Sequence, residues 1–168
     1  MLRQLHISDG KLVESHNGEA VVFVYIAPDE NERKYLVEQL KIDEHTLSSS
    51  LDPDELSRLE FEPEHIAMIF KRPTRYRAED NFLFKVGSAG VFVFKNFLVI
   101  VISEDAPLFE GRPFTKVQSI QDIFLRLIYR AIIHFVEHIR GINAVSSELE
   151  QYIYTSMENK HLLNLFTL

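Results

Sequence analysis

The sequence predicts a mixed α/β domain followed by a long helical segment, and three observations support this fold class. Short runs of β-branched and other apolar residues recur before residue 104, as is typical of strands. Tight links between the later runs predict a mixed, largely antiparallel sheet. From Ser119 the apolar residues recur at helical spacing, and the pattern still continues at Leu168. We therefore expect a sheet domain over residues 1–118 and a helical segment packing on it over residues 119–168.

The first strands are expected to form a hairpin and a central strand. Leu2–Ile7 and Lys11–Glu14 are joined by Asp9-Gly10, a dipeptide that accepts the positive φ angles of a tight turn. Val21–Ile26 is almost wholly apolar, as expected of a strand that is covered on both faces. This strand is therefore predicted in the centre of the sheet.

Two helices and five more strands are expected next. Proline suits the first helical position and carboxylates suit the positive end of the helix dipole, so a helix is predicted from Pro28 to Lys41. A second, short helix is expected over Asp43–Leu51. The strands predicted after it are Arg58–Glu62, His65–Lys71, Phe82–Val86, Val91–Lys95 and Phe97–Ser103. Gly87–Gly90 is interpreted as a tight link between two of these strands, and Glu104–Pro113 as the loop that closes the sheet domain.

The last segment has a wide apolar stripe. Ser119 and Asp122 predict a capping box at the start of a helix. The stripe consists of Ile120, Ile123, Phe124, Leu127, Ile128, Ala131, Ile132, Phe135, Val136 and Ile139. A stripe of this width predicts packing against a sheet. After Gly141 it narrows toward a heptad-like seam, which fits a stalk or a helix that meets partner helices.

Composition argues against several classes of function. The net charge of −7 and the lack of an arginine and lysine block disfavour nucleic acid as a partner. The absence of cysteine excludes disulfides and thiolate metal sites and fits a reducing cytosol. The longest apolar run, Phe97–Ile102, is too short to span a membrane. Because neither a glycine-rich phosphate loop nor a nucleophile elbow is present, we do not expect an enzyme.

Two groups of residues suggest a metal site. His134 and His138 flank Glu137 with the i, i+4 spacing of metal ligands, although partly buried structural histidines commonly have the same spacing. An acidic cluster contains Asp52, Asp54, Glu55, Glu60, Glu62 and Glu64. Its oxygens suit a hard cation, but alternation along Arg58–Glu62 also predicts an ordinary solvated strand face. A metal-dependent hydrolase built on the two histidines and a nearby carboxylate is therefore kept as one hypothesis for the function.

The stretch around Leu51–Pro73 has the strongest resemblance to a known family. Four motifs resemble the cytosolic domain of CorA-type divalent-cation transporters: Ile42-x-x-His45-x-Leu47, Leu51-Asp52-Pro53-Asp54-Glu55, Arg58-Leu59-Glu60 and Ile66-x-x-Ile69-Phe70-x-x-Pro73. Asp122-Ile123-Phe124 and the pattern from Ile139 to Glu150 resemble the helix that leads into that family's stalk.

The resemblance implies a three-layer α/β/α sandwich with a long C-terminal stalk helix. It also implies a homopentamer that funnels divalent cations toward a membrane pore and senses intracellular magnesium between its subunits. Magnesium is the first expectation for the cation, with zinc and cobalt as alternatives. On this resemblance, Asp80 and secondarily Glu79, in the loop Arg77–Asn81, are candidate contacts for a regulatory cation, and an exposed turn is the alternative.

The same resemblance places the pore outside this chain. The family's Gly-Met-Asn motif and its membrane helices would follow Leu168, so we expect a fragment of a longer protein on the cytoplasmic side of the inner membrane. By itself such a fragment would be soluble and would reach the membrane only through the missing C-terminal helices. The competing hypothesis is a free-standing soluble scaffold whose exposed helix docks a partner.

Overall fold

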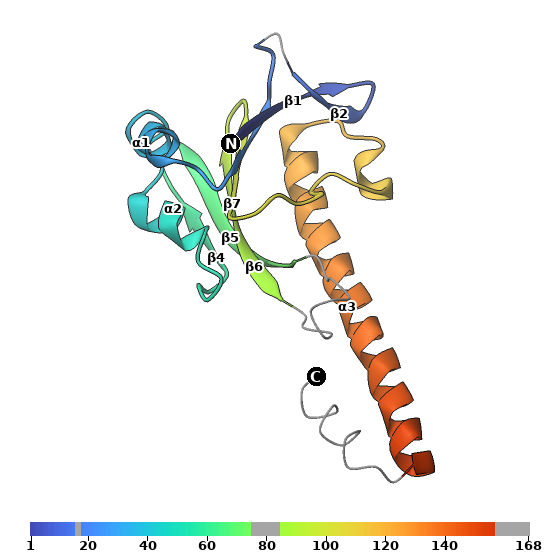
Figure 1. Cartoon of the computed structure of the whole chain (residues 1–168). Coiled ribbons are helices and arrows are strands. Elements are labelled where there is room, and N and C mark those ends of the chain that lie inside the picture. The colour runs from blue at the N-terminus through green and yellow to red at the C-terminus, as the bar shows by residue number, and fades with distance from the viewer. Residues whose placement is uncertain (16–17, 75–84, 157–168) are drawn as a thin grey trace.

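The computed structural model describes residues 1–15, 18–74 and 85–156 of the chain. Its strands are β1 (Leu2–Ser8), β2 (Lys11–Glu14), β3 (Val22–Ile26), β4 (Arg58–Phe61), β5 (His65–Pro73), β6 (Val86–Phe94) and β7 (Leu98–Ile102). Its helices are α1 (Glu30–Glu38), α2 (Glu44–Ser49), the 3-10 turn η2 (Arg112–Phe114) and α3 (Ile120–Ser156). Helices α1 and α2 lie on one side of the sheet and α3 on the other (Figure 1). The predicted three-layer α/β/α fold with a long C-terminal helix is confirmed.

The described strands form one seven-stranded sheet in the order β2-β1-β3-β7-β6-β5-β4. β3 and β7 are parallel, with Val22 opposite Leu98, and the other described neighbours are antiparallel. The turn between β1 and β2 has Asp9 at φ 48° and Gly10 at φ 73°, so the predicted hairpin is confirmed. β3 lies between β1 and β7, as expected for a covered inner strand.

Two apolar clusters, one on each face, hold the three layers together. All five residues of β7 are buried, because alternate side chains point to opposite faces and both faces are covered. Val99 and Val101 belong to the cluster that contains Leu36 of α1 and Leu47 of α2. Ile100 belongs to the other cluster, which contains Ile123 and Leu127 of α3. The buried residues of this cluster are Leu5, Val22, Val24, Ile26, Ala89, Val91, Leu98, Ile100, Ile102, Phe114, Val117, Ile123 and Leu127.

Helix α1 is shorter than the sequence predicts. It begins after Asp29, whose carboxylate accepts the Glu32 amide at 2.8 Å while the Glu32 carboxylate accepts the Asp29 amide at 3.0 Å. This reciprocal cap satisfies two amide groups at the helix start and leaves Pro28 outside the helix. The other end falls at Glu38, well before the predicted Lys41, which has a left-handed φ of 57°.

The prediction of a link at Gly87–Gly90 is wrong. These residues lie inside β6, which pairs with β5 from Val86 to Phe94 without a break. A Cβ at Gly90 would lie 2.0 Å from the Ser50 Oγ and 2.6 Å from its Cβ, so glycine lets the end of α2 approach the sheet. The strand predicted over Phe82–Val86 lies mostly outside the described residues.

Helix α3 contacts the sheet only through its first turns. Half of the predicted capping box is present at its start, where the Asp122 amide donates to the Ser119 hydroxyl at 3.2 Å. The other half is not formed, because the Asp122 carboxylate accepts from the Gln118 amide instead of the Ser119 amide. The helix continues through Gly141 and extends past the sheet (Figure 1). Ile132, Val136 and Ile139 are exposed, so the prediction that the whole stripe packs on the sheet is wrong.

Candidate functional site

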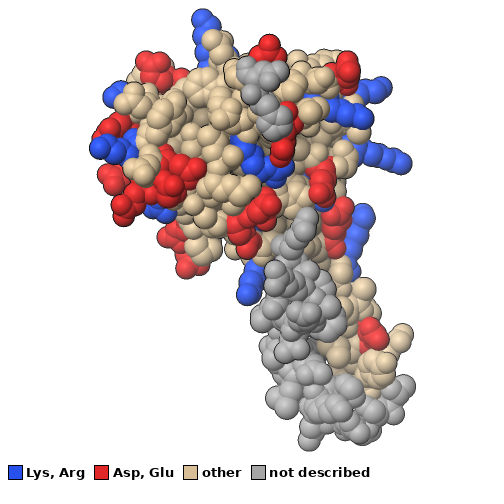
Figure 2. Space-filling view, turned by 45° about the horizontal axis from the view of Figure 1, so that its top comes forward, with Lys and Arg blue, Asp and Glu red and all other residues tan. Residues whose placement is uncertain are grey.

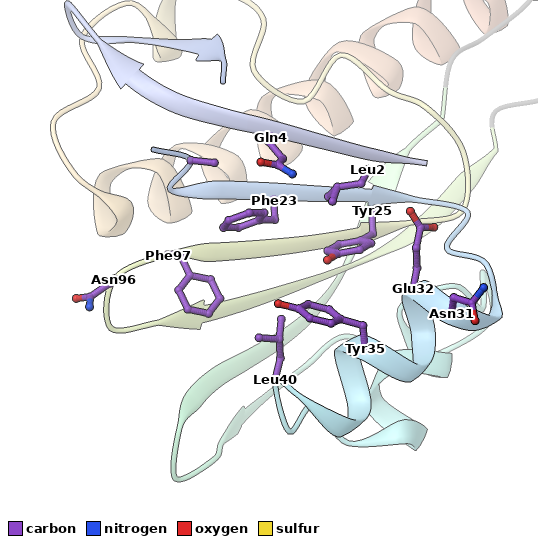
Figure 3. A pocket seen from close by; sticks show the side chains of 11 residues that line it. Leu2, Gln4, Phe23, Tyr25, Asn31, Glu32, Tyr35, Leu40, Asn96 and Phe97 are labelled. Carbon is purple, nitrogen blue, oxygen red and sulfur yellow. The ribbon is translucent and has the colours of Figure 1, made fainter. Parts of the chain in front are cut away.

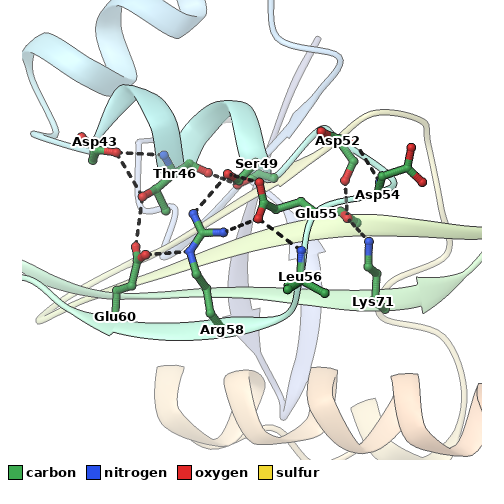
Figure 4. A network of polar contacts seen from close by, with 12 residues as sticks. Asp43, Thr46, Ser49, Asp52, Asp54, Glu55, Leu56, Arg58, Glu60 and Lys71 are labelled. Carbon is green, nitrogen blue, oxygen red and sulfur yellow. Dashed lines mark hydrogen bonds and ion pairs between the residues drawn. The ribbon is translucent and has the colours of Figure 1, made fainter.

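The acidic cluster predicted between Asp52 and Glu64 is part of a polar network that fixes α2 to the sheet edge (Figure 4). Arg58 of β4 contacts the Glu55 carboxylate at 2.9 Å and the Glu60 carboxylate at 2.6 Å, and donates to the Ser49 hydroxyl at 3.1 Å. Glu60 also accepts from the Thr46 hydroxyl at 3.0 Å. The carboxylates of Glu55 and Glu60 are therefore occupied by contacts with Arg58 and with hydroxyl groups of α2.

The other acidic residues of the cluster do not meet at a point that could hold a cation. Asp52 accepts the Asp54 amide at 2.9 Å, as an Asx turn does, and its carbonyl accepts the Ser88 hydroxyl at 2.6 Å. In the same segment, the Pro53 carbonyl accepts a hydrogen bond from the Lys71 ammonium group. Within residues 1–15, 18–74 and 85–156, no group of three or more histidine or acidic side chains is placed to hold a metal. Asp52, Glu55 and Glu60 of the acidic cluster therefore have structural roles.

The predicted histidine pair lies where sequence spacing places it, on α3. The rings of His134 and His138 meet edge to face, with centroids 4.7 Å apart. Burial, and then the neighbouring charges of His138 and Arg130, lower the pKa of His134, which favours its neutral form. A hydrolytic metal site needs a third ligand. The described residues bring no third ligand to this pair, so they give the hydrolase hypothesis no support.

The predicted cation contacts Asp80 and Glu79 lie outside the described residues, in the stretch of sequence between β5 and β6. Their assignment to a regulatory cation stays a prediction.

Helix α3 presents an apolar row that no described residue covers. We call Leu125, Tyr129, Ile132, Val136 and Ile139 the α3 row; their side chains are between 36% and 62% exposed. They follow one another at intervals of four and three residues, the spacing of a coiled-coil seam. At 3.6 residues per turn, the α3 row lies opposite Ile123 and Leu127, which meet the sheet.

The exposed surface of α3 supports a role in packing. On the visible part of its far half, uncharged side chains predominate, whereas acidic and basic side chains are interspersed over the sheet domain (Figure 2). The row was not predicted, because Ile132, Val136 and Ile139 were assigned to the sheet-facing stripe and Leu125 and Tyr129 were not included in any apolar face. The four-three spacing from Leu125 to Ile139 was the signal that could have separated the row from that stripe. No helix within the described ranges is long and apolar enough to cross a bilayer.

A second open surface lies beside α1, where the helical layer stops short of β1 and β3. It is a groove of about 700 Å³ whose walls include Phe23, Tyr25, Tyr35 and Phe97 (Figure 3). Burial raises the pKa of Tyr25 to about 12, with smaller contributions from Tyr35 and Glu32, so the phenol stays protonated at neutral pH. The groove is aromatic and carries no feature that selects a particular ligand.

Comparison with known proteins gives one family. The family described as CorA-like Mg2+ transporter protein matches residues 19–168. No curated protein matches the sequence significantly. The soluble domain of CorA from Methanocaldococcus jannaschii has a similar fold, with a TM-score of 0.71 and 15% identity over 96% of this chain and 67% of that one.

Two full-length structures have the same fold over part of their length. The complete CorA magnesium transporter from Methanocaldococcus jannaschii has a TM-score of 0.68 and 13% identity, and the match covers 95% of this chain and 52% of that one. The full-length CmaX protein has a TM-score of 0.69 and 12% identity, covering 93% and 52%. This chain therefore spans about half the length of these two structures. At such low identity the likeness shows the fold alone.

Proposed function

Because the chain belongs to the CorA-like Mg2+ transporter family, we propose that it is the cytosolic regulatory and funnel domain of a divalent-cation transporter. In this proposal the domain assembles as a homopentamer on the cytoplasmic side of the inner membrane. It couples the intracellular cation level to a pore made by other parts of the protein. Magnesium is the proposed cation, and the domain itself carries out no catalytic reaction.

The α3 row is the observation that carries the proposal. Five large apolar side chains at heptad spacing, on a helix that extends past its own domain, suit packing against further helices. In a transporter, such helices would be supplied by the rest of the subunit and by neighbouring subunits. The α3 row would then join the sheet domain mechanically to the pore.

Cation sensing is proposed at Asp80 and Glu79. A divalent cation shared between one subunit and its neighbour would stabilise one arrangement of the ring, and its release would leave carboxylates that repel one another. The cation level would thereby shift the equilibrium between a closed and an open pore.

Sensing can be tested on the full-length protein in liposomes. We expect millimolar magnesium to raise the melting temperature of the wild type and to reduce cation flux. The double variant Asp80→Asn, Glu79→Gln should lose both responses. Glu19→Gln removes an exposed carboxylate elsewhere and should keep both. An unchanged melting temperature of the wild type with magnesium would overturn the sensing role.

The role of the α3 row can be tested by assembly. Ile132→Glu places a charge in the middle of the row and should prevent the full-length protein from forming its oligomer, as measured by light scattering in detergent. Leu56→Glu changes a side chain that is 76% exposed outside α3 and should leave the oligomer intact. Equal behaviour of the two variants would contradict the proposal.

The α3 row also suits a second candidate function, a soluble scaffold that docks a partner helix. Flux separates the two functions. A scaffold would bind through α3 but would not move cations when the full-length protein is placed in liposomes.

A further inference from the structure

A polar cavity lies between α3 and the ends of β5 and β6. Its volume is about 810 Å³, and the segment Glu104–Leu108 forms another of its walls. It is lined by Phe70 and Arg72 of β5, by Lys85, and by Arg130 and His134 of α3. It is separate from the Arg58 network, which lies on the α2 side of the sheet.

Arg72 is the unusual residue of this cavity. Only 7% of it is exposed, and its Nε has no hydrogen-bond partner among the described residues. Its Nη2 donates to the Glu104 carbonyl at 3.3 Å, and it forms no ion pair with a carboxylate of the described residues. A guanidinium stays protonated at neutral pH even where burial lowers its pKa, as burial does for Arg72. Glu104 and Asp105 act on Arg72 as neighbouring negative charges, but neither carboxylate forms an ion pair with its guanidinium. A buried charge that no ion pair neutralises is costly, so an anion bound directly at Arg72 would relieve the cost.

The other charged residues that line the cavity are more exposed than Arg72. Arg130 is oriented by the Glu137 carboxylate at 3.2 Å and adds a second guanidinium to the lining. Glu104 and Asp105 also line the cavity, but both are exposed, and Asp105 contacts Arg3 at 3.6 Å. Arg72 is therefore the buried charge of the cavity, Arg130 is partly exposed, and the two carboxylates are exposed.

We propose that this cavity binds a small oxyanion, a phosphate or a carboxylate group, through the guanidinium of Arg72. Arginine presents its N–H groups as a planar fork that matches two oxygens of such a group, and the unpartnered Nε supplies one arm of that fork. Arg130 and His134 contribute the opposite wall. The site goes beyond cation transport, because it requires neither a divalent cation nor a membrane.

The test uses the chain itself, with EDTA present and ionic strength held constant with chloride. Inorganic phosphate and acetate are titrated separately while the melting temperature is measured. At ten times the dissociation constant, the better ligand should raise the melting temperature by about 3–6 °C, and the response should saturate. Phosphate acting at the lower concentration identifies a phosphate ligand, and acetate a carboxylate.

Three variants assign the response to Arg72. Arg72→Met should melt no lower than the wild type without anion and should lose the response, because it removes an uncompensated buried charge. Arg72→Lys keeps the charge but lacks the planar fork and should weaken binding at least tenfold. Arg140→Gln removes the same charge from an exposed position of α3 and should respond like the wild type.

The outcomes are distinct from those of the transport test. A wild type that responds to neither anion overturns the site, and so does a response that Arg72→Met retains. Should Arg72→Met fail to fold, the Arg72 Nε–H NMR signal of the wild type decides: a saturable shift with anion supports the site, and no shift overturns it. None of these results depends on cation flux.

Discussion

The two faces of the sheet are covered by helices in different ways. On one face α1 and α2 are short and capped by Asp29 and Asp43, and the Arg58 network joins α2 to the sheet edge. On the other face one long helix touches the sheet with its first turns and then leaves it, with the α3 row uncovered (Figure 1). The first face is covered except at the groove beside α1, whereas no described residue covers the α3 row on the second face.

This difference separates residues that stabilise the domain from residues available for assembly. Polar groups of the Arg58 network satisfy one another, so a change there is expected to alter folding first. Apolar groups of the α3 row are only partly buried in the described domain, so a change there should alter association first. Three predictions test this division within the chain, from the largest expected effect to the smallest.

The largest effect is expected from the same substitution at two positions of α3. Ile123 is fully buried against the sheet, so Ile123→Ala should lower the free energy of unfolding by about 2–5 kcal/mol. Ile132 is 55% exposed, and Ile132→Ala should change the free energy by less than about 0.5 kcal/mol, since alanine also favours the helix. Urea unfolding of the two variants measures the difference. Equal losses would show that Ile132 is covered in the isolated chain.

The second prediction concerns the close contact of α2 with β6. Gly90→Ala should lower the free energy of unfolding by about 1–3 kcal/mol, because its Cβ would meet Ser50 at 2.0–2.6 Å. Removing the obstacle with Ser50→Gly in the same chain should recover part of the loss, beyond the sum of the single effects in urea unfolding. Additive effects of the two substitutions would show that the contact does not limit the packing.

The sequence predicts the local elements better than it predicts their contacts. Val21–Ile26 and the Asp9-Gly10 hairpin were predictable because a buried strand and a tight turn each have a local signature. The glycines of β6 were wrongly predicted to form a turn. Gly90 is needed because of its close contact with Ser50, which is forty residues away in the sequence. A contact of that range leaves no local signal.

The candidate sites also differ in whether a local pattern or a long-range contact determines them. The α3 row could have been predicted from its spacing, since Leu125 to Ile139 belong to one helix. Arg72 could not, because its burial depends on α3 and on the segment around Glu104, both distant in sequence. Isolated charges in a strand pattern are usually solvated, so nothing in the sequence marked this one. Asp80 and Glu79 were assigned by resemblance alone and stay predictions.

The smallest effect distinguishes the helix starts on the two faces by pH. The Thr46 amide lowers the pKa of Asp43 at the start of α2, whereas the Arg126 side chain is the main cause that lowers the pKa of Asp122 in α3. Both carboxylates therefore add stability above their unfolded pKa of about 4, and this stability is lost as the pH falls through the lowered values. Acid unfolding should begin in that range for the wild type.

Replacing each aspartate by asparagine separates the two causes. Asparagine still caps a helix, so Asp43→Asn should match the wild type at pH 7 and lose less stability between pH 4 and pH 2. Asp122→Asn breaks the 2.5 Å contact with Arg126 and should be less stable by about 0.3–0.5 kcal/mol at pH 7, with the difference vanishing in acid. Urea midpoints at pH 7, 4 and 3 measure both. Identical pH profiles for the two variants would mean that a charge pair, rather than the Thr46 amide, stabilises the ionised form of Asp43, and the contribution of Asp43 would then be screened by salt as that of Asp122 is.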